Sequence, residues 1–344
     1  MDLIEKYKII ISKMNNIDYE SIWQDFHKYN IALYNDNYVC YQGRLIPKTN
    51  DFLANTSIKY NNEMIGIWYL QEEIDDDILT SKLIHETFHA FQMESKESRY
   101  PNELEALIKY KYDLRNLSLK NLENKLIVEL IDTFNRAKFD ELMYIRKTRL
   151  ALYPYEVEYE MKIEQIEGTA NYVELESLKQ LNYNKYQNKL NQMKNTILNC
   201  NNLFPVRIIS YDVGALLIKV LVDNLLNINF HFTNNYYIDY LLNTDIPVVL
   251  NIKESVVLKI KLKEFISETR RLIKKSVTEE NLIIKGNFKL LGVNVYNARY
   301  LDNFIITDYF LMYKENNEDK ILNGDFVVKV DNDLIISDVY KLVR

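Results

Sequence analysis

Cysteine, histidine, glycine and proline are all scarce in this chain, whose 344 residues include 2, 4, 7 and 5 of them, respectively. The two cysteines, Cys40 and Cys200, are far apart in the sequence and do not have the spacing of metal ligands. They could form a disulfide, but two isolated thiols are more typical of unpaired residues in a reducing compartment. We therefore expect neither a disulfide framework nor a cysteine-based metal site.

The sequence also lacks a long apolar run and an excess of positive charge. No stretch is long enough to span a membrane, and the amino terminus is too charged for a signal peptide. The net charge of -6 argues against a nucleic-acid-binding surface, which is ordinarily basic. These absences predict a soluble, cytoplasmic protein that binds neither membrane nor nucleic acid.

Two of the four histidines fall within residues 85–89, whose sequence is His-Glu-Thr-Phe-His. Around them, apolar residues recur at helical spacing and three aspartates come first, where they favour the positive end of a helix dipole (Leu83, Ile84, Phe88 and Phe91; Asp75, Asp76 and Asp77). On such a helix, His85 and His89 project from one face, one turn apart.

Two neutral imidazoles in this arrangement can bind one zinc ion, Zn²⁺. Glu86 lies beside them in the sequence and can take a proton from a zinc-bound water. We therefore predict a catalytic zinc helix with His85 and His89 as ligands and Glu86 as general base. The alternative is a helix whose histidines are only packed or solvated.

The hydrophobic pattern along the rest of the chain predicts an α+β protein. A sheet lobe is expected over about residues 31–100, a helical lobe over about 101–277 and a carboxy-terminal antiparallel β region over 278–344. Within the first lobe, strands are expected at 31–34, 38–41, 52–60 and 64–70. In the second, helices are expected at 156–181, 206–226, 236–242 and 254–275, with a solvated helix or linker at 183–201.

A zinc site with two histidines needs at least one more protein ligand, and residues 90–100 contain no histidine. The expected helix over 156–181 carries an acidic stripe, whose alternative explanation is a solvated face (Glu160, Glu164, Glu167, Asn171 and Glu174). Gly168 costs about 1 kcal/mol in mid-helix, which indicates that another backbone, that of the zinc helix, passes close by. We predict Glu167 as the third ligand, with Asn171 orienting a ligating histidine and Glu164 as the main competitor.

The motif His85-Glu-x-x-His89-x-x-Gln92, followed 78 residues after His89 by Glu167-Gly-x-Ala-Asn-Tyr, resembles the gluzincin branch of the zinc metallopeptidases, the thermolysin-like zincins. The resemblance covers roughly residues 52–226. It implies a zincin-like domain over 1–277, in which a mixed sheet packs on the zinc helix and a cleft separates it from a helical lobe. It also implies that residues 64–70 form the edge strand that pairs with an extended peptide. Asn171 departs from the family pattern, since many such enzymes carry Asp there.

The family mechanism needs a hydrogen-bond donor for the oxyanion that forms on the attacked carbonyl. Tyr211, within residues 207–214, resembles the Tyr-x-x-Gly segment found downstream in related sequences, and His231 is the alternative. Either residue can also have a purely structural role.

The leading hypothesis is a zinc-dependent metallopeptidase that acts on a peptide or protein substrate. The rival is a catalytically silent, zincin-like binding or regulatory protein that works through its carboxy-terminal β region. A structural zinc in an interaction domain is a third interpretation, but it gives Glu86 no reason to lie between the ligands. The β region over 278–344 carries no recognisable chemistry and is expected to cover the catalytic lobe or to form a small accessory domain.

Overall fold

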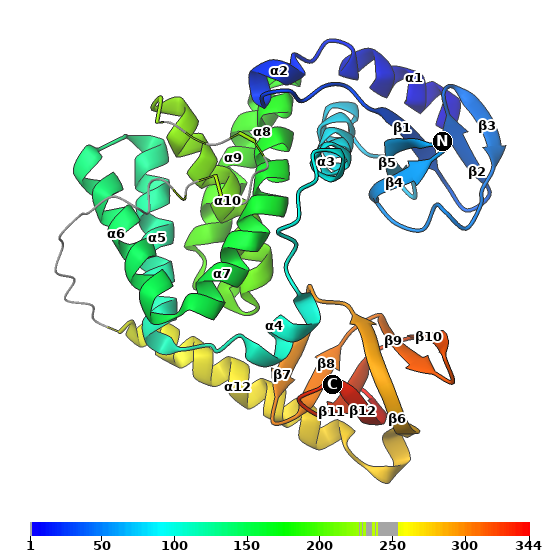
Figure 1. Cartoon of the computed structure of the whole chain (residues 1–344), viewed down its shortest axis with the longest axis vertical. Helices are drawn as coiled ribbons and strands as arrows, with labels where there is room; N and C mark the ends of the chain where they lie inside the picture. Colours follow the sequence, from blue (N-terminus) through cyan, green and yellow to red (C-terminus); the bar gives the residue numbers. More distant parts are fainter. Residues whose placement is uncertain (1, 227, 229, 232–235, 238, 240–253) are drawn as a thin grey trace.

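The computed structural model describes residues 2–226, 228, 230–231, 236–237, 239 and 254–344. It is α+β, with one mixed sheet, one antiparallel sheet and a group of helices (Figure 1), so the predicted class is confirmed. The helix expected at 236–242 lies almost wholly outside the described residues. In the part of the chain that is described, no helix is long and apolar enough to cross a membrane. Cys40 and Cys200 are both free, as expected.

The amino-terminal part combines a five-stranded mixed sheet with the helices α1 (Leu3–Met14) and α2 (Tyr19–Ile22). The strand order is β3 (Arg44–Pro47), β2 (Tyr38–Tyr41), β1 (Asn30–Tyr34), β5 (Glu63–Tyr69) and β4 (Thr56–Tyr60). Strand β3 was not expected from the sequence, and β4 begins later than the expected strand over 52–60. The prediction that residues 64–70 form the edge of the sheet is wrong. Strand β5 pairs with β1 in parallel and with β4 in antiparallel, so β4, and not β5, lies at this edge of the sheet.

Helix α3 (Asp76–Glu94) lies on one face of this sheet and carries the two histidines. The Asp75 side chain caps its amino terminus by accepting hydrogen bonds from the backbone N–H groups of Asp77 and Ile78. The helix approaches the sheet closely, because a Cβ added at Gly66 of β5 would lie 2.9 Å from Thr87 Cγ2. The absence of a side chain at Gly66 therefore allows α3 to pack closely on β5.

The helical lobe begins with α4 (Glu103–Lys109) and continues through six further helices, α5 to α10. Their bounds are α5 (Leu114–Asp132), α6 (Arg136–Leu152), α7 (Pro154–Ile163), α8 (Thr169–Leu181), α9 (Tyr183–Leu198) and α10 (Val206–Asp223). The helix expected over 156–181 is present, but a π-helical turn (Glu164–Gly168) separates α7 from α8. Helix α8 packs against α3, and this packing joins the helical lobe to the sheet lobe.

A close helix crossing lies at the end of the π-helical turn. A Cβ added at Gly168 would lie 2.7 Å from the Cα of Gly214 in α10. The prediction that another backbone passes close to Gly168 is therefore confirmed, although that backbone belongs to α10 and not to α3, the helix expected to bind zinc. Because glycine faces glycine here, the two helix backbones come into direct contact.

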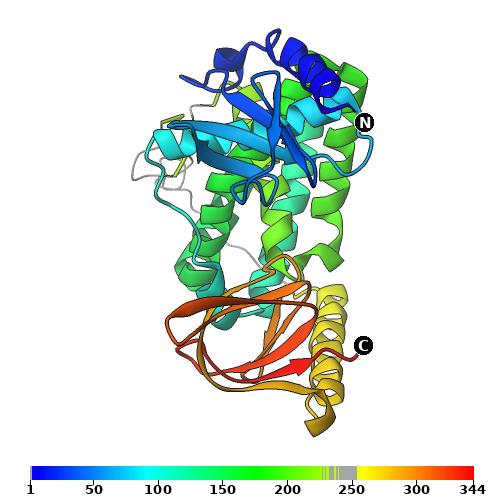
Figure 2. The same ribbon diagram turned by 90° about the vertical axis from the view of Figure 1, so that its right-hand side faces the viewer.

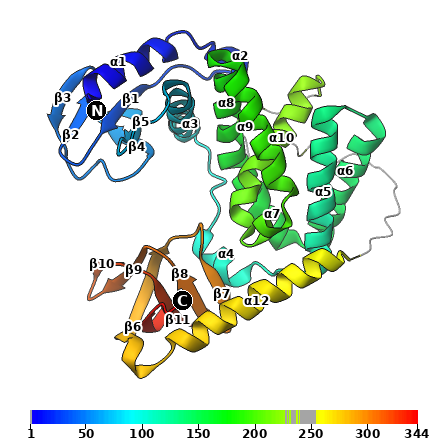
Figure 3. The same ribbon diagram turned by 180° about the vertical axis from the view of Figure 1, so that it is seen from behind.

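The carboxy-terminal part is a seven-stranded antiparallel sheet linked to the helical lobe by the long helix α12 (Val256–Ser276) (Figure 3). The strand order is β10 (Glu318–Asn323), β9 (Phe310–Glu315), β6 (Leu282–Val293), β12 (Ile335–Lys341), β11 (Phe326–Val330), β8 (Phe304–Thr307) and β7 (Arg299–Leu301). Helix α12 runs alongside this sheet (Figure 2), and its Leu272 packs against Ile306 and Val327. Leu104 and Leu107 of α4 pack against the core of the sheet from the other side.

Candidate metal centre

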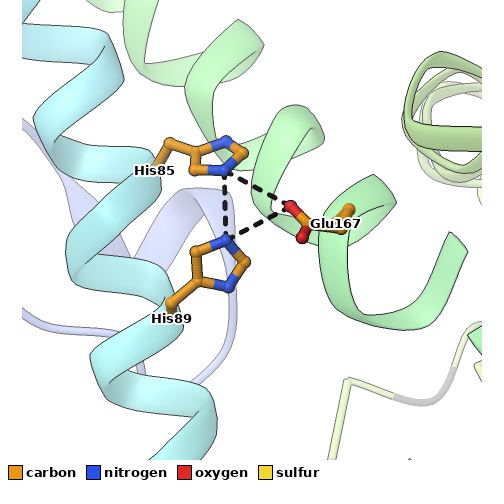
Figure 4. Close-up of side chains that lie close together, drawn as sticks. All are labelled: His85, His89 and Glu167. Atoms are coloured by element: carbon orange, nitrogen blue, oxygen red, sulfur yellow. Dashed lines mark hydrogen bonds and ion pairs between the residues drawn. The ribbon is translucent and has the colours of Figure 1, made fainter. Parts of the chain in front are cut away.

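His85, His89 and Glu167 converge from two different helices (Figure 4). The Nε2 atoms of His85 and His89 are 3.1 Å apart. Glu167 Oε2 lies 3.8 Å from His85 Nε2 and 3.5 Å from His89 Nε2. Tetrahedral zinc with bonds of about 2.0–2.1 Å holds its ligand atoms about 3.3 Å from one another. The three side chains therefore match the spacing of three ligands around one such ion.

Gln92 fixes which nitrogen of His89 faces the centre. Its fully buried carboxamide donates from Nε2 to the carbonyl oxygen of Ile166 and to Thr169 Oγ1, both at 2.9 Å. A carbonyl oxygen can only accept, so the NH2 end of the amide must lie there and Oε1 must face His89 Nδ1 at 2.8 Å. His89 Nδ1 is therefore the protonated donor, and in the neutral ring Nε2 keeps its lone pair for a metal ion.

The other ring nitrogen of His85, Nδ1, faces the carboxylate of Glu174. From the sequence, Glu174 was only one member of the acidic stripe. His85 Nδ1 lies 3.5 Å from Glu174 Oε2, and Lys189 Nζ lies 3.1 Å from the other oxygen of Glu174. Burial raises the pKa of Glu174, but His85 and Lys189 outweigh it and hold the pKa well below its usual range. Asn171, predicted to orient a histidine, instead donates to Asp212 Oδ1 at 3.3 Å. Glu174, and not Asn171, therefore lies where it can orient the ring of His85.

The π-helical turn explains why Glu167 reaches the histidines and Glu164 does not. A π turn contains an extra residue, which rotates the following helix by about 100° relative to an unbroken α-helix. The predicted single acidic stripe is thus divided between two faces. Glu164 is fully buried on the other face, where it pairs with Lys120 and Arg146. The division of the stripe could not be predicted from the sequence, because a single stripe follows only if the helix is a regular α-helix throughout.

Glu164 is one of six fully buried charges that lie together in the helical lobe. Three are basic and three acidic, and they form one neutral network (Lys120, Arg146 and Arg149; Glu123, Glu160 and Glu164). Burial raises the pKa of Glu160, but Arg149 and Lys120 outweigh it and lower the pKa to about 2. Glu164 is therefore committed to neutralising buried cations and is not available to a metal ion.

The electrostatics of the candidate centre favour a bound cation. Burial raises the pKa of Glu167, but His89 and His85 outweigh it and lower the pKa to about 2. Burial lowers the pKa of His89, but Glu167 outweighs it and raises the pKa to about 9. Without a metal ion, these shifts favour a proton on His89 beside an ionised Glu167. A divalent cation can take the place of that proton and satisfy the same carboxylate.

A pocket of about 380 Å³ opens over these three side chains. Glu86 lines it beside the histidines, and Thr56 and Ser57 bring the edge strand β4 to its rim. The opposite wall comes from Arg207 and Tyr211. The site is therefore accessible from outside, and an edge strand with an unpaired side borders it.

Tyr211 lies in this pocket, whereas His231 does not. Arg207 donates a hydrogen bond to the Tyr211 hydroxyl, and the guanidinium lies 5.0 Å from the Tyr211 ring centre. Burial raises the pKa of Tyr211 far above its usual value, so its hydroxyl stays protonated. His231 is 59 % exposed and its Nδ1 lies 3.9 Å from Asp25 Oδ2, away from the residues that line the pocket.

Sequence reasoning missed Tyr296, which lines the same pocket from the carboxy-terminal β region. Its ring lies 4.7 Å from the Arg207 guanidinium, so Arg207 contacts two tyrosine rings at once. No local motif marks Tyr296, because only the packing of the β region brings it to this pocket.

Comparison of the chain with protein-family models, with curated proteins and with solved structures found no match. The function therefore has to be argued from the geometry of the site itself.

Proposed function

We propose that this protein is a zinc-dependent metallopeptidase of the zincin type, with His85, His89 and Glu167 as the zinc ligands. The observation that carries the proposal is the convergence of two Nε2 atoms and one carboxylate oxygen within 3.1–3.8 Å, in a pocket that also contains Glu86. The outer nitrogens of both histidines face oxygen atoms of buried side chains, as is usual for metal-ligating histidines.

The chemistry needs a metal ion and a base in one place. His85, His89 and Glu167 would hold a zinc ion, which would lower the pKa of a bound water toward about 7 and polarise a carbonyl group. Glu86 accepts the proton of the attacking water and delivers it to the leaving amine. The protonated Tyr211 hydroxyl donates to the oxyanion, with Arg207 holding the ring in place.

The position of β4 supports an extended peptide as substrate. This strand pairs with β5 on one side only, and its residues Thr56 and Ser57 border the metal pocket. An extended chain can pair with the unpaired backbone groups of an edge strand. The peptide bond to be cleaved then lies over the metal centre.

The test combines metal content with hydrolysis of a mixed peptide library. The native protein should contain about one zinc per chain, and His85→Ala and Glu167→Gln should lose it. His27→Ala is the matched control, because His27 is exposed and outside the pocket. Glu86→Gln should keep its zinc and lose about 10²–10⁴-fold in kcat, which is the usual contribution of a general base.

Absence of zinc after it has been supplied would overturn the metal site. A native protein that binds zinc but cleaves no peptide would support the silent binding or regulatory protein instead. Undiminished hydrolysis by zinc-loaded Glu86→Gln would overturn the assigned mechanism.

A further inference from the structure

A second, smaller hollow lies next to the metal pocket, with room for about 60 Å³. The two hollows share Glu103 and Arg207 as a common wall. The segment that follows β6 lines both, with Tyr296 in the metal pocket and Val295 and Arg299 in the smaller hollow. A group attached to a substrate in the metal pocket therefore has this hollow, hereafter the side cavity, as its immediate neighbour.

The wall between the two hollows is already neutral. Arg207 Nε donates to Glu103 Oε1 at 2.8 Å, and the Tyr159 hydroxyl donates to Glu103 Oε2 at 2.7 Å. The Glu103 carboxylate is thus satisfied by two donors and balanced by one guanidinium. It is not available to neutralise a further cation in the side cavity.

Arg299 is that further cation. In the part of the chain that the structure describes, no carboxylate forms a hydrogen bond or ion pair with its guanidinium, which lies 5.1 Å from the Phe265 ring centre. The nearby carboxylate of Glu268 is bound by Arg271 at 2.6 Å. The side cavity therefore has a net positive charge and an Arg with unused donors.

We propose that the side cavity is a substrate subsite in which Arg299 binds a carboxylate. The proposal rests on the peptidase function and adds a substrate class to it, namely peptides with an acidic group next to the cleaved bond. Arginine binds carboxylates in a two-pronged geometry that an amide cannot match. A space of this size holds about four to six water-sized groups, which is enough for a carboxylate and a short methylene stem. Tyr110 and Tyr112 supply aromatic walls for such a stem.

The carboxylate can come from an acidic side chain or from the carboxy terminus of the peptide. Peptides that carry Glu or Gln at each position around the cleaved bond distinguish the first source. Peptides with a free or an amidated carboxy terminus distinguish the second. One of the two pairs should show a preference of about ten-fold or more in kcat/KM for the carboxylate form, as expected of charge-assisted hydrogen bonds.

Arg299→Gln should abolish this preference, because its amide cannot bind a carboxylate with two charge-assisted hydrogen bonds. Arg299→Lys keeps the charge and should retain part of the preference. Arg270→Gln is the matched control, since Arg270 is exposed, pairs with Asp302 at 3.6 Å and lies outside both hollows. A preference that survives Arg299→Gln, or equal cleavage of both members of every peptide pair, would overturn the subsite.

Binding of a small probe separates this proposal from the peptidase function. N-acetylglutamate should raise the melting temperature of the native protein and of Arg270→Gln, but not that of Arg299→Gln, and N-acetylglutaminamide, which has no carboxylate, should raise none. If no peptide is cleaved but this pattern holds, the peptidase function fails and the carboxylate site stands. If neither assay depends on Arg299, the residue only packs on Phe265 and the proposal is wrong.

Discussion

Gln92→Leu should weaken zinc binding although Gln92 touches no metal ion. Leucine has a similar size but cannot accept the hydrogen bond from His89 Nδ1 or donate to the Ile166 carbonyl. Loss of such an outer partner of a metal ligand typically weakens metal binding by 10–100-fold, or about 1.4–2.8 kcal/mol. The metal-free protein should also lose about 2–3 kcal/mol of unfolding free energy, because a buried ring nitrogen is left without an acceptor.

The zinc dissociation constant can be measured by competition with a chelator of known affinity, and the unfolding free energy by urea denaturation with excess chelator. Asn124→Leu is the matched control, because it removes another fully buried carboxamide, one that donates to the Ile197 carbonyl at 2.9 Å. The control should lose stability with an unchanged zinc affinity. A zinc affinity within two-fold of the native value in folded Gln92→Leu would refute the assigned tautomer and the role of the amide.

Two further predictions address carboxyl groups of the helical lobe. Glu164→Gln should keep the zinc stoichiometry but lose about 3–5 kcal/mol of unfolding free energy, because Arg146 and Lys120 lose a buried counter-charge; zinc loss measured by elemental analysis would instead make Glu164 a ligand. Burial outweighs Lys189 and raises the pKa of Asp212 from 3.8 to about 7, so the folded state binds the proton more tightly and loses stability as the pH rises through this range. Relative to the native protein, the unfolding free energy of Asp212→Asn should therefore rise by about 2–4 kcal/mol as the pH is raised from 4 to 8, measured by urea denaturation with chelator. A difference between the two proteins that does not change with pH would contradict the shifted pKa.

Local features of the chain could be predicted because they depend on neighbours in the sequence. The helix around residues 85–89 is one example, since its apolar spacing and its aspartate cap act within a few turns. The pairing of the two histidines follows from the same regular geometry. Glycine in mid-helix likewise indicated a close backbone contact before the contacting helix was known.

The order of the strands could not be predicted from periodicity. Residues 64–70 have the alternation of a half-buried strand, but alternation does not state how many neighbours a strand has. Pairing with β1 and with the hairpin partner β4 leaves β4 at the edge. A different strand therefore borders the metal pocket.

The sequence by itself determined the helix that carries His85 and His89 and the α+β class, because helical spacing and strand alternation are properties of short segments. Only the tertiary structure decided which glutamate faces the histidines, since a single π turn moves Glu164 and Glu167 onto different faces. It also decided that Glu174, and not Asn171, meets His85, and that the carboxy-terminal sheet supplies Tyr296 to the pocket. These contacts join residues that are distant in the chain, and they exist only because the packed cores of three parts of the molecule fix the positions of their helices and loops.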